Sequence, residues 1–313
     1  MPFISVIIPL YNKEMFIEAT LLSVLNQTFS DYEIIIINDG STDDSVRNAT
    51  KTLRGYNNYN IITQENKGLS ATRNIGISHA KGEIIALLDA DDLWDKRYLE
   101  EIKKLCLKYP EAALFGTDYF EKYTDSNVLE PAKNIFKNLR NTSFLANDFF
   151  KLSLFQSIIT NSSFCLKKTV FEDITFNETI DFAEDIEFFI KSNLRYKLAY
   201  SYKPLAIVHF DIPNQMTKAG FKGKKLPNFD QFEEHTDRHP TLKKYLDINR
   251  YYLIILCRIS NDQQNLNLLK KQLDVSNLKF RQRILLNAPL IILKSLRYIK
   301  KRLLKKNIRL TSY

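Results

Sequence analysis

Residues 84–92, Ile-Ile-Ala-Leu-Leu-Asp-Ala-Asp-Asp, decide the fold expected for this chain. The five apolar residues predict a buried strand, and the three carboxylates follow at its carboxyl end, where open α/β sheets bind ligands. Three like charges within four residues repel one another unless a cation neutralises them. A divalent cation that shares phosphate oxygens with a substrate would do so. The alternative is an acidic turn in which Asp92 caps a helix that starts near Trp94.

On both sides of this stretch, apolar runs alternate with amphipathic segments. Strands are predicted at residues 4–9, 33–38, 59–62 and 112–115, and helices at about 13–25, 44–53, 69–80 and 96–108. Because the connections are short, the pattern indicates an α/β fold with a doubly wound, mostly parallel sheet and right-handed crossovers. After residue 117 the alternation is expected to break down, and residues 157–167 predict a strand that returns to the sheet.

Composition narrows the class of protein. A length of 313 residues suits one large α/β domain with an appendage, or two domains. The three cysteines are scattered, which favours a reducing compartment and no structural zinc site. No apolar stretch is long enough to cross a bilayer, and the N-terminus resembles a first strand rather than a secretory signal. We therefore expect a cytoplasmic protein.

The net charge of +9 is unevenly distributed. All 36 acidic residues precede Val275, whereas 11 of the 45 basic residues follow it, so the first part of the chain is close to neutral. Residues 288–307 predict a helix, with Asn287 as a possible cap. Its apolar face would hold Ile292, Leu293, Leu296, Ile299, Leu303 and Leu304, with basic residues largely opposite. Such a helix suits an anionic membrane surface; docking on the body and a nucleic-acid contact are the alternatives.

Polar residues follow the predicted strands at their carboxyl ends. Tyr11 follows the first, Asp39 the second, Asn66 the third, and Asp89 and Asp91 the fourth. Each alone suits ordinary turn chemistry. Four parallel strands bring their carboxyl ends to one edge of the sheet, so together these residues predict a single polar cleft.

Four stretches in order carry a family resemblance: residues 5–12 (SVIIPLYN), 38–43 (NDGSTD), 66–74 (NKGLSATRN) and 89–92 (DADD). They resemble the opening motifs of family 2 glycosyltransferases with the GT-A fold, over about residues 3–120. The sequence contains neither the Gly-x-Gly-x-x-Gly pattern after its first strand nor a P-loop, which argues against a Rossmann dinucleotide enzyme and a P-loop NTPase.

The resemblance implies a UDP-sugar donor. Asp39 would accept a hydrogen bond from the uracil N–H, and Pro9 and Tyr11 would shape the base pocket. Asn66 and Arg73 would face the nucleotide and its diphosphate, with Arg73 offering a planar fork of donors to phosphate oxygens. The alternative for Arg73 is a surface arginine on the helix at 69–80.

The resemblance also implies a Mn²⁺ or Mg²⁺ cofactor. Asp89 would contact ribose or sugar, and Asp91 would hold the metal against both phosphates. His209, at the end of a predicted strand from 203 to 210, is a further candidate for the metal; the alternative is a packed or surface histidine.

A second acidic group lies at Glu184-Asp185. Phe182, Ile186 and Phe189 share one helical face, and carboxylates are favoured at the start of a helix by its dipole, which is the purely structural interpretation. The pair also resembles the Glu-Asp motif of the same family. That resemblance implies that Asp185 is the general base of an inverting transfer and that Glu184 orients the site or the acceptor.

These observations predict a catalytic domain over residues 1–212, with a nucleotide-sugar-binding half (1–117) and an acceptor-binding half (118–212). A helical region with a basic amphipathic tail would follow at 213–313, and residues 218–225 are a candidate lid. The expected function is metal-dependent inverting transfer of one sugar from a UDP-sugar to a glycan or lipid-linked acceptor in surface polysaccharide synthesis. The protein would lie peripherally on the inner face of the cell membrane and bind no nucleic acid. The alternatives are a nucleotidyltransferase and a non-catalytic membrane-surface adaptor.

Overall fold

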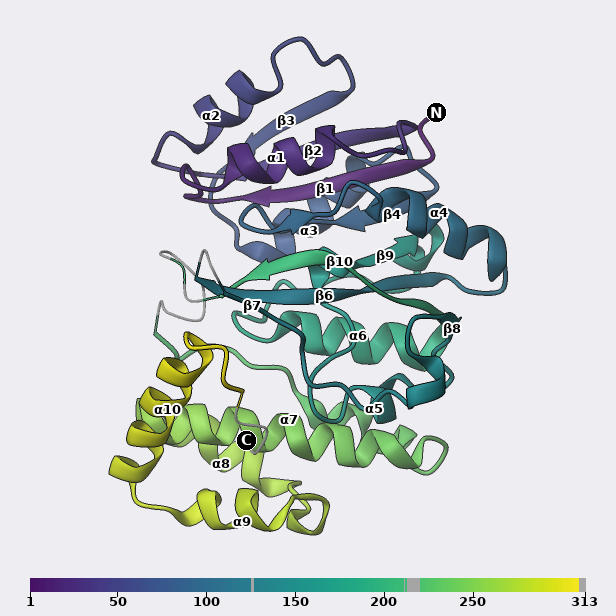
Figure 1. Ribbon diagram of the computed structural model, residues 1–313. Helices are drawn as coiled ribbons and strands as arrows, with labels where there is room; N and C mark the ends of the chain where they lie inside the picture. Colours follow the sequence, from purple (N-terminus) through teal and green to yellow (C-terminus); the bar gives the residue numbers. More distant parts are fainter. Residues whose placement is uncertain (125–126, 211, 213–219, 310–313) are drawn as a thin grey trace.

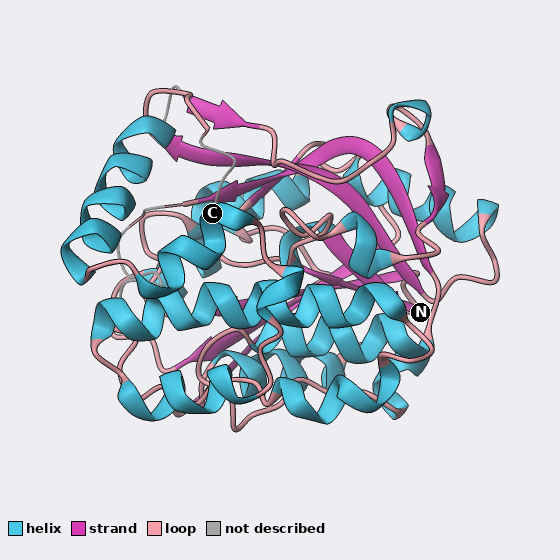
Figure 2. Cartoon of the chain, turned by 90° about the horizontal axis from the view of Figure 1, so that it is seen from below, coloured by secondary structure: helices cyan, strands magenta, loops and turns pink. Residues whose placement is uncertain are grey.

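The computed structural model describes residues 1–124, 127–210, 212 and 220–309. The strands in these ranges form one ten-stranded sheet, whose main path runs β3-β2-β1-β4-β9-β6-β10-β5, with β7 beside β6 and β8 beside β10. Helices cover both faces of the sheet, and further helices stack beyond one of them (Figures 1 and 2). The predicted α/β architecture is therefore confirmed.

The first half of the sheet is parallel. β1 (Ile4–Leu10) pairs with β2 (Tyr32–Asp39) on one side and β4 (Ile84–Leu87) on the other, and β2 pairs with β3 (Tyr59–Gln64). The connections hold α1 (Ile17–Leu25), α2 (Ser45–Thr52) and α3 (Leu69–His79). All four strands end at the same edge, so the residues that follow them meet there.

Side chains alternate along each strand and supply two cores, one on each face of the sheet. Val6 and Ile8 of β1 pack with α1, α2 and α4 (Tyr98–Lys108), whereas Ile7 packs on the opposite face. There α3 approaches so closely that a Cβ on Gly76 would overlap the side chain of Ile7. The opposite face also carries α5 (Phe149–Leu152), α6 (Glu184–Arg195) and α7 (Pro240–Ser260).

The second half of the sheet is mixed. β6 (Leu114–Thr124) and β10 (Leu198–His209) are parallel, and β9 (Phe164–Lys167) lies antiparallel between β4 and β6. β7 (Asn127–Leu129) and β8 (Ser143–Leu145) add short antiparallel edges. β6 extends beyond residue 117, where the alternation was expected to end. Only the last four residues of the predicted strand at 157–167 pair with the sheet, since Asn161–Ser163 form a 3₁₀ turn.

The capping interpretation of Asp92 is wrong. Asp92 is followed by the two-residue strand β5 (Leu93–Trp94), which pairs with β10, and α4 begins only at Tyr98. The carboxylate of Asp92 instead accepts hydrogen bonds from Ser162 Oγ (2.5 Å) and from the backbone amide of His209 (2.9 Å). It therefore ties the ends of three elements together beneath the acidic turn.

The C-terminal region is helical, with α8 (Gln263–Lys271), α9 (Phe280–Asn287) and α10 (Leu290–Leu304) stacked near α7 (Figure 1). The helix expected at 288–307 is interrupted at its start by Pro289, so Asn287 ends α9 and does not cap α10. Leu293 and Leu304 of α10 are buried, whereas Ile292 and Ile299 are exposed. None of the helices in the described ranges combines the length and apolarity needed to cross a bilayer.

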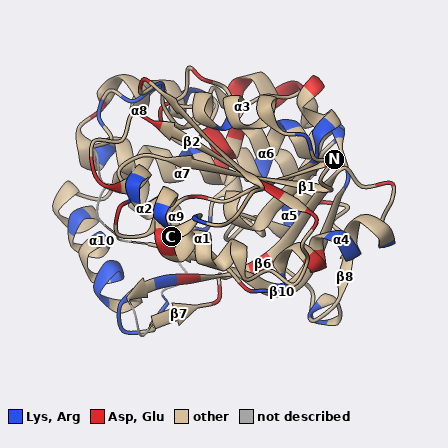
Figure 3. Cartoon of the chain, turned by 90° about the horizontal axis from the view of Figure 1, so that it is seen from above, with Lys and Arg blue, Asp and Glu red and all other residues tan. Residues whose placement is uncertain are grey.

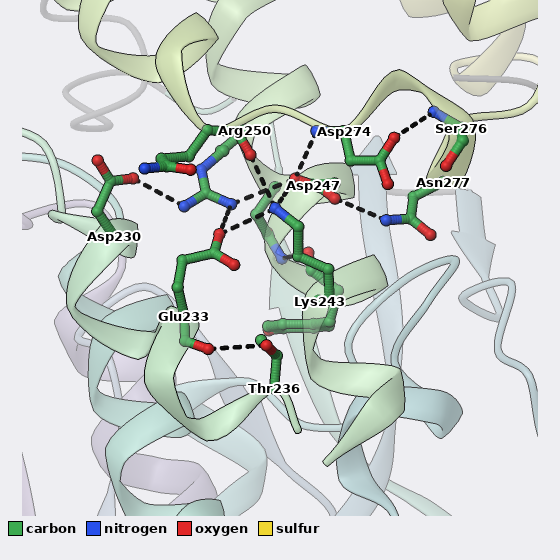
Figure 4. Close-up of polar contacts among 12 residues, drawn as sticks. Asp230, Glu233, Thr236, Lys243, Asp247, Arg250, Asp274, Ser276 and Asn277 are labelled. Atoms are coloured by element: carbon green, nitrogen blue, oxygen red, sulfur yellow. Dashed lines mark hydrogen bonds and ion pairs between the residues drawn. The ribbon is translucent and has the colours of Figure 1, made fainter. Parts of the chain in front are cut away.

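A buried charge cluster, defined by Asp230, Glu233, Lys243, Asp247 and Arg250, fixes α7 in place (Figure 4). Asp247, which is 0% exposed, accepts hydrogen bonds from Lys243 Nζ (3.1 Å) and Arg250 Nη1 (3.2 Å). Arg250 also reaches Asp230 (2.8 Å) and Glu233 (2.6 Å), on the 3₁₀ helix Phe229–His235. Because its charges are paired, the cluster holds the start of the C-terminal region to the segment before it.

Candidate active site

The ten residues predicted from sequence line one cleft of about 710 Å³ at the carboxyl edge of the sheet. They are Pro9, Tyr11, Asp39, Asn66, Arg73, Asp89, Asp91, Glu184, Asp185 and His209. They come from β1, β2, the segment after β3, α3, the turn after β4, α6 and β10. The predicted convergence on one cleft is confirmed, and the individual roles stay predictions.

Asp39 forms one end of the cleft and is rigidly held. Its Oδ1 accepts hydrogen bonds from Gln64 Nε2 (2.7 Å) and the amide of Lys67 (2.8 Å). Its Oδ2 accepts one from the amide of Gly68 (3.0 Å). An ionised carboxylate has about four acceptor positions, so one stays available to a ligand donor such as an imide N–H.

Pro9, Tyr11 and Asn66 line the same cleft as Asp39. Pro9 is within β1, Tyr11 follows β1 and is 46% exposed, and Asn66 is exposed on the segment before α3. A cleft that holds both an exposed aromatic ring and a fixed carboxylate suits a planar, hydrogen-bonding ligand.

Arg73 lies under the floor of the cleft, 1% exposed, and joins the two acidic groups. Its Nη2 donates to Asp89 Oδ1 (2.8 Å) and its Nη1 to Glu184 Oε1 (2.9 Å). Burial disfavours the charge of Arg73, but Asp89 and Glu184 more than offset this and raise its pKa above the ordinary value. The surface interpretation of Arg73 is wrong. Its terminal nitrogens engage carboxylates, and phosphate contact stays a prediction.

Asp91 forms an ion pair with Lys13, at 2.7 Å between Nζ and Oδ2. Burial raises the pKa of Asp91 above its ordinary value, and Lys13 opposes this rise. Sequence reasoning assigned Lys13 only to the start of a helix. The signal that could have identified it is its place two residues after Tyr11, at the edge where the acids gather and a cation is needed.

Asp185 projects from the first turn of α6 into the cleft. Among the described residues, only the Ile186 amide hydrogen-bonds to its carboxylate, at 2.9 Å. Burial, reinforced by the charge of Glu184, raises the pKa of Asp185 to about 7. The residue before the pair, Ala183, has φ of 65°, an uncommon left-handed conformation for a residue other than glycine. This bend turns the chain sharply into α6.

His209 ends β10 at the rim of the cleft. Its backbone amide binds Asp92, and its ring lies 6.3 Å from that of Phe16, centroid to centroid. Within the ranges that the structure describes, no three His, Cys, Asp or Glu side chains are arranged to hold a metal ion. The donor set still fits Mg²⁺ or Mn²⁺ bound as a complex, because such ions take one or two carboxylates and complete their shell with phosphate oxygens and water. Asp91 would supply such a carboxylate.

One wall of the cleft comes from the C-terminal half, within the segment 218–225 that was predicted as a candidate lid without individual site residues. Lys222, Gly223 and Lys224 line the cleft. The Gly223 amide donates to the carboxylate of Asp262 (2.9 Å), the residue before α8. The Lys225 amide donates to the Asp181 carboxylate (3.0 Å), and the Lys225 carbonyl accepts a hydrogen bond from the Asp181 amide (2.9 Å). Part of the candidate lid at 218–225 lies outside the described residues. Its basic residues lie in an irregular segment, so no periodicity pointed to them.

Comparison with known proteins identifies the family. The model of glycosyl transferase family 2 matches residues 5–172, more than half of the chain. The chain belongs to glycosyltransferase family 2. The matched segment contains the Asp39, Arg73 and Asp89–Asp92 motifs, and it ends before Glu184-Asp185.

Individual relatives agree with this membership. Over 223 residues, 71% of this chain, it is 26% identical to the uncharacterized glycosyltransferase EpsJ of Bacillus subtilis. Over 195 residues, 60% of this chain, it is 30% identical to an uncharacterized glycosyltransferase of Haemophilus influenzae. The chain spans 64% and 59% of the lengths of these two relatives.

The fold of this family 2 member is shared with a solved structure, that of S. aureus TarS 1–349 in complex with UDP-GlcNAc. The likeness has a TM-score of 0.61 at 17% identity and covers 97% of this chain and 90% of that one. It therefore includes the C-terminal helices as well as the sheet.

Proposed function

We propose that this chain transfers one sugar from a UDP-sugar to a hydroxyl of a glycan or lipid-linked acceptor, with inversion at the anomeric carbon. The observation that carries the proposal is Asp185, a carboxyl whose pKa is raised to about 7, in the same cleft as Asp39 and Asp91. A general base works best with a pKa near the working pH. TarS, which shares the fold, was solved with UDP-GlcNAc and with UDP, and this supports a UDP-sugar donor.

Each group in the cleft has one task in this scheme. Asp39 accepts a hydrogen bond from the uracil, and Pro9 and Tyr11 enclose the base. Asp185 takes the proton of the acceptor hydroxyl while that oxygen attacks the anomeric carbon. The bond from this carbon to the diphosphate oxygen breaks, and UDP leaves from the opposite face. A single displacement of this kind inverts the configuration.

Arg73 acts indirectly, as a positioning residue. Its fork fixes Asp89 and Glu184 on either side of the reacting centre, and Glu184 in turn precedes the base. A bound Mn²⁺ or Mg²⁺, held by Asp91 with His209 as a candidate second ligand, would supply positive charge for the diphosphate leaving group.

The acceptor and the location are proposed from the family resemblance and from the surface of α10. Family resemblance favours a surface polysaccharide, and one relative is named a cholesterol galactosyltransferase, 30% identical over 192 residues. Basic residues recur along α10 (Figure 3), and Ile291, Tyr298 and Ile299 are exposed beside them. This face suits the anionic inner surface of a cell membrane, where a lipid-linked acceptor would lie.

Two substitutions test the proposal, with nucleotide-sugar turnover and UDP binding measured in parallel. Asp185→Asn should retain Mn²⁺-dependent UDP binding and lose transfer by about 10²–10⁴-fold, the usual contribution of a general base. Asp91→Asn should lose Mn²⁺-dependent UDP binding. Asp173→Asn makes the same chemical change on the surface outside the cleft and should leave both unchanged.

The outcomes separate the alternatives. Near-normal turnover by the Asp185 variant would rule out this base. Unchanged UDP affinity in the Asp91 variant would rule out its metal role. A nucleotidyltransferase would require a nucleoside triphosphate and would not depend on Asp185. An adaptor would show no turnover of any nucleotide sugar in the wild-type protein.

A further inference from the structure

The acids of the turn after β4 are paired within the protein. Each acid of the turn after β4 has a neutralising or hydrogen-bonding partner in the protein itself: Arg73 for Asp89, Lys13 for Asp91, and Ser162 for Asp92. The partner of Asp91 is an ammonium group only 13% exposed, as is the carboxylate it meets. The predicted metal-binding carboxylate is therefore already engaged by a cation.

The backbone of Lys13 is firmly held. Its amide donates to Ser45 Oγ at 2.6 Å. On one side Asn12, with φ of 49°, accepts a bond from the Thr42 amide at 2.8 Å. On the other side the Glu14 amide donates to Asp43 at 3.1 Å. These bonds fix the turn after β1 to the turn before α2, so any movement of Lys13 belongs to its side chain.

The side chain itself is suited to exchange partners. Lysine is a compact charge on a flexible stem with three donors, in contrast to the fixed fork of arginine. Lys13 lines the cleft together with Asp89 and Asp91. Arg73, by comparison, is 1% exposed and held by two carboxylates, which leaves it little freedom to move.

We infer that Lys13 is the counter-ion of Asp91 in the protein, that the divalent metal displaces its ammonium from Asp91, and that the displaced ammonium then pairs with the nucleoside diphosphate. This rests on the proposed function. A metal arriving alone gains the Asp91 carboxylate only by breaking its ion pair with Lys13. When diphosphate arrives with the metal, its phosphate oxygens receive the displaced ammonium. Metal and diphosphate therefore bind cooperatively, and the ammonium of Lys13 is the source of the coupling.

The test is a titration with Mn²⁺, alone and with saturating UDP, in which free Mn²⁺ is measured by electron paramagnetic resonance. Lys13→Gln removes the competing charge and should tighten the binding of Mn²⁺ alone by about 3–10-fold, the range set by ion pairs of modest net strength. The factor by which UDP improves Mn²⁺ affinity should shrink accordingly. Lys13→Arg keeps a cation beside Asp91 and should therefore not tighten the binding of Mn²⁺ alone.

Lys67→Gln is the matched control, since Lys67 also lines the cleft but follows β3 and is exposed. It should leave the affinity for Mn²⁺ alone unchanged. Unchanged or weaker binding of Mn²⁺ alone by the Lys13→Gln protein would overturn the inference. An equal increase in the affinity for Mn²⁺ alone in the Lys13 and Lys67 variants would also overturn it, because loss of any positive charge in the cleft would then have the same effect.

Failure of this inference can be told from failure of the proposed function. If Asp91→Asn abolishes Mn²⁺-dependent UDP binding while Lys13→Gln changes nothing, the metal role stands and only the counter-ion role is lost. If Asp91→Asn leaves Mn²⁺-dependent UDP binding unchanged, the metal role itself fails.

Discussion

At the scale of single residues, burial and the neighbouring charge of Arg73 act in opposite directions on the pKa of Asp185. Burial and the adjoining Glu184 carboxylate raise its pKa, and Arg73 opposes them but is itself held by Glu184 and Asp89. The guanidinium therefore neutralises the two flanking acids more directly than the base. A carboxyl with a pKa near neutrality results.

This gives a prediction for pH dependence. Because the base must be ionised, kcat/KM should rise with pH and level off above an apparent pKa of about 7, falling about tenfold per pH unit on the acid side. The measurement is kcat/KM at saturating Mn²⁺ from pH 5 to 9, since this ratio reports the free enzyme. An acid limb centred near pH 4 would contradict the assignment of Asp185 as a buried base.

Arg73 offers a second prediction at this scale. Arg73→Lys keeps the charge but cannot reach Asp89 and Glu184 together, so one carboxylate loses its partner. We expect kcat to fall by about 10²-fold, as small misplacements of catalytic groups can cause, with little change in KM for the nucleotide sugar. If Arg73 holds the diphosphate directly, KM and the Kd for UDP should rise instead. Steady-state kinetics with a UDP-binding assay distinguishes the two roles.

At the scale of elements, the long helix α7 carries two fully buried charged residues, Asp247 and Arg250. Asp247 accepts bonds from Lys243 and Arg250, from the Asp274 amide (3.3 Å) and from Asn277 Nδ2 (2.8 Å). One carboxylate thus connects α7 to the segment between α8 and α9. Its loss would leave two cations partly unpaired in a buried site.

We therefore predict that Asp247→Ala lowers the free energy of unfolding by about 3–5 kcal/mol, the cost of breaking a buried ion pair from one side. Asp230→Ala is the matched control, because Asp230 also meets Arg250 but its side chain is 39% exposed. Urea denaturation of both variants measures the difference. Equal losses would show that the depth of the cluster is unimportant.

The elements also show what sequence patterns can predict. The parallel strands β1, β2 and β4 follow from their apolar runs, because both of their faces are buried. The place of β9 does not follow, since four residues with a 3₁₀ turn before them carry no period. Asp92 misled for a physical reason: an acid before an apolar pair resembles a helix cap, and its true partners, Ser162 and His209, are distant in the chain.

At the scale of the whole molecule, α9 and α10 form an exposed basic face fixed to the body. Arg258 of α7 donates to the carbonyls of Leu285 and Leu286 in the last turn of α9 and to that of Ala288, which lies between α9 and α10. Beyond α10, Arg309 pairs with Glu121 of β6. Leu293 and Leu304 of the predicted apolar face pack against the body. A membrane would therefore contact the remaining exposed residues, such as Ile291 and Tyr298.

This arrangement decides how membrane binding should be tested. Deleting the tail would remove the buried Leu286, Leu293 and Leu304, expose the apolar surface that they cover and disturb the fold. Replacing Lys294, Arg297 and Arg302 by Gln removes three exposed charges and should weaken co-sedimentation with phosphatidylserine vesicles by about 1 kcal/mol per residue. The same change at Arg47, Lys51 and Arg54 near α2 is the control. Equal loss in both variants would show that only net charge matters.

The residues that line the cleft could be predicted from the sequence, but the ion pairs between them could not. All ten predicted residues meet in one cleft because parallel strands deliver their ends to one edge. The pairs Lys13–Asp91 and Arg73–Glu184 were not foreseen, because they join segments 78 and 111 positions apart whose approach depends on the tertiary fold. The available signal for Lys13 was that three acids gather at that edge without a basic side chain assigned as their partner.

The insertion of β9 between β4 and β6 has a consequence for biogenesis. β4 ends at Leu87, but its antiparallel neighbour begins only at Phe164, so this edge of β4 stays unpaired while about a quarter of the chain, residues 88–163, is synthesised. Until then β4 presents an open row of amides and carbonyls flanked by isoleucines, the kind of surface on which chains associate wrongly. Expression fragments that stop before residue 164 should accumulate as aggregates, and slow translation of the intervening segment should lower the yield of native protein.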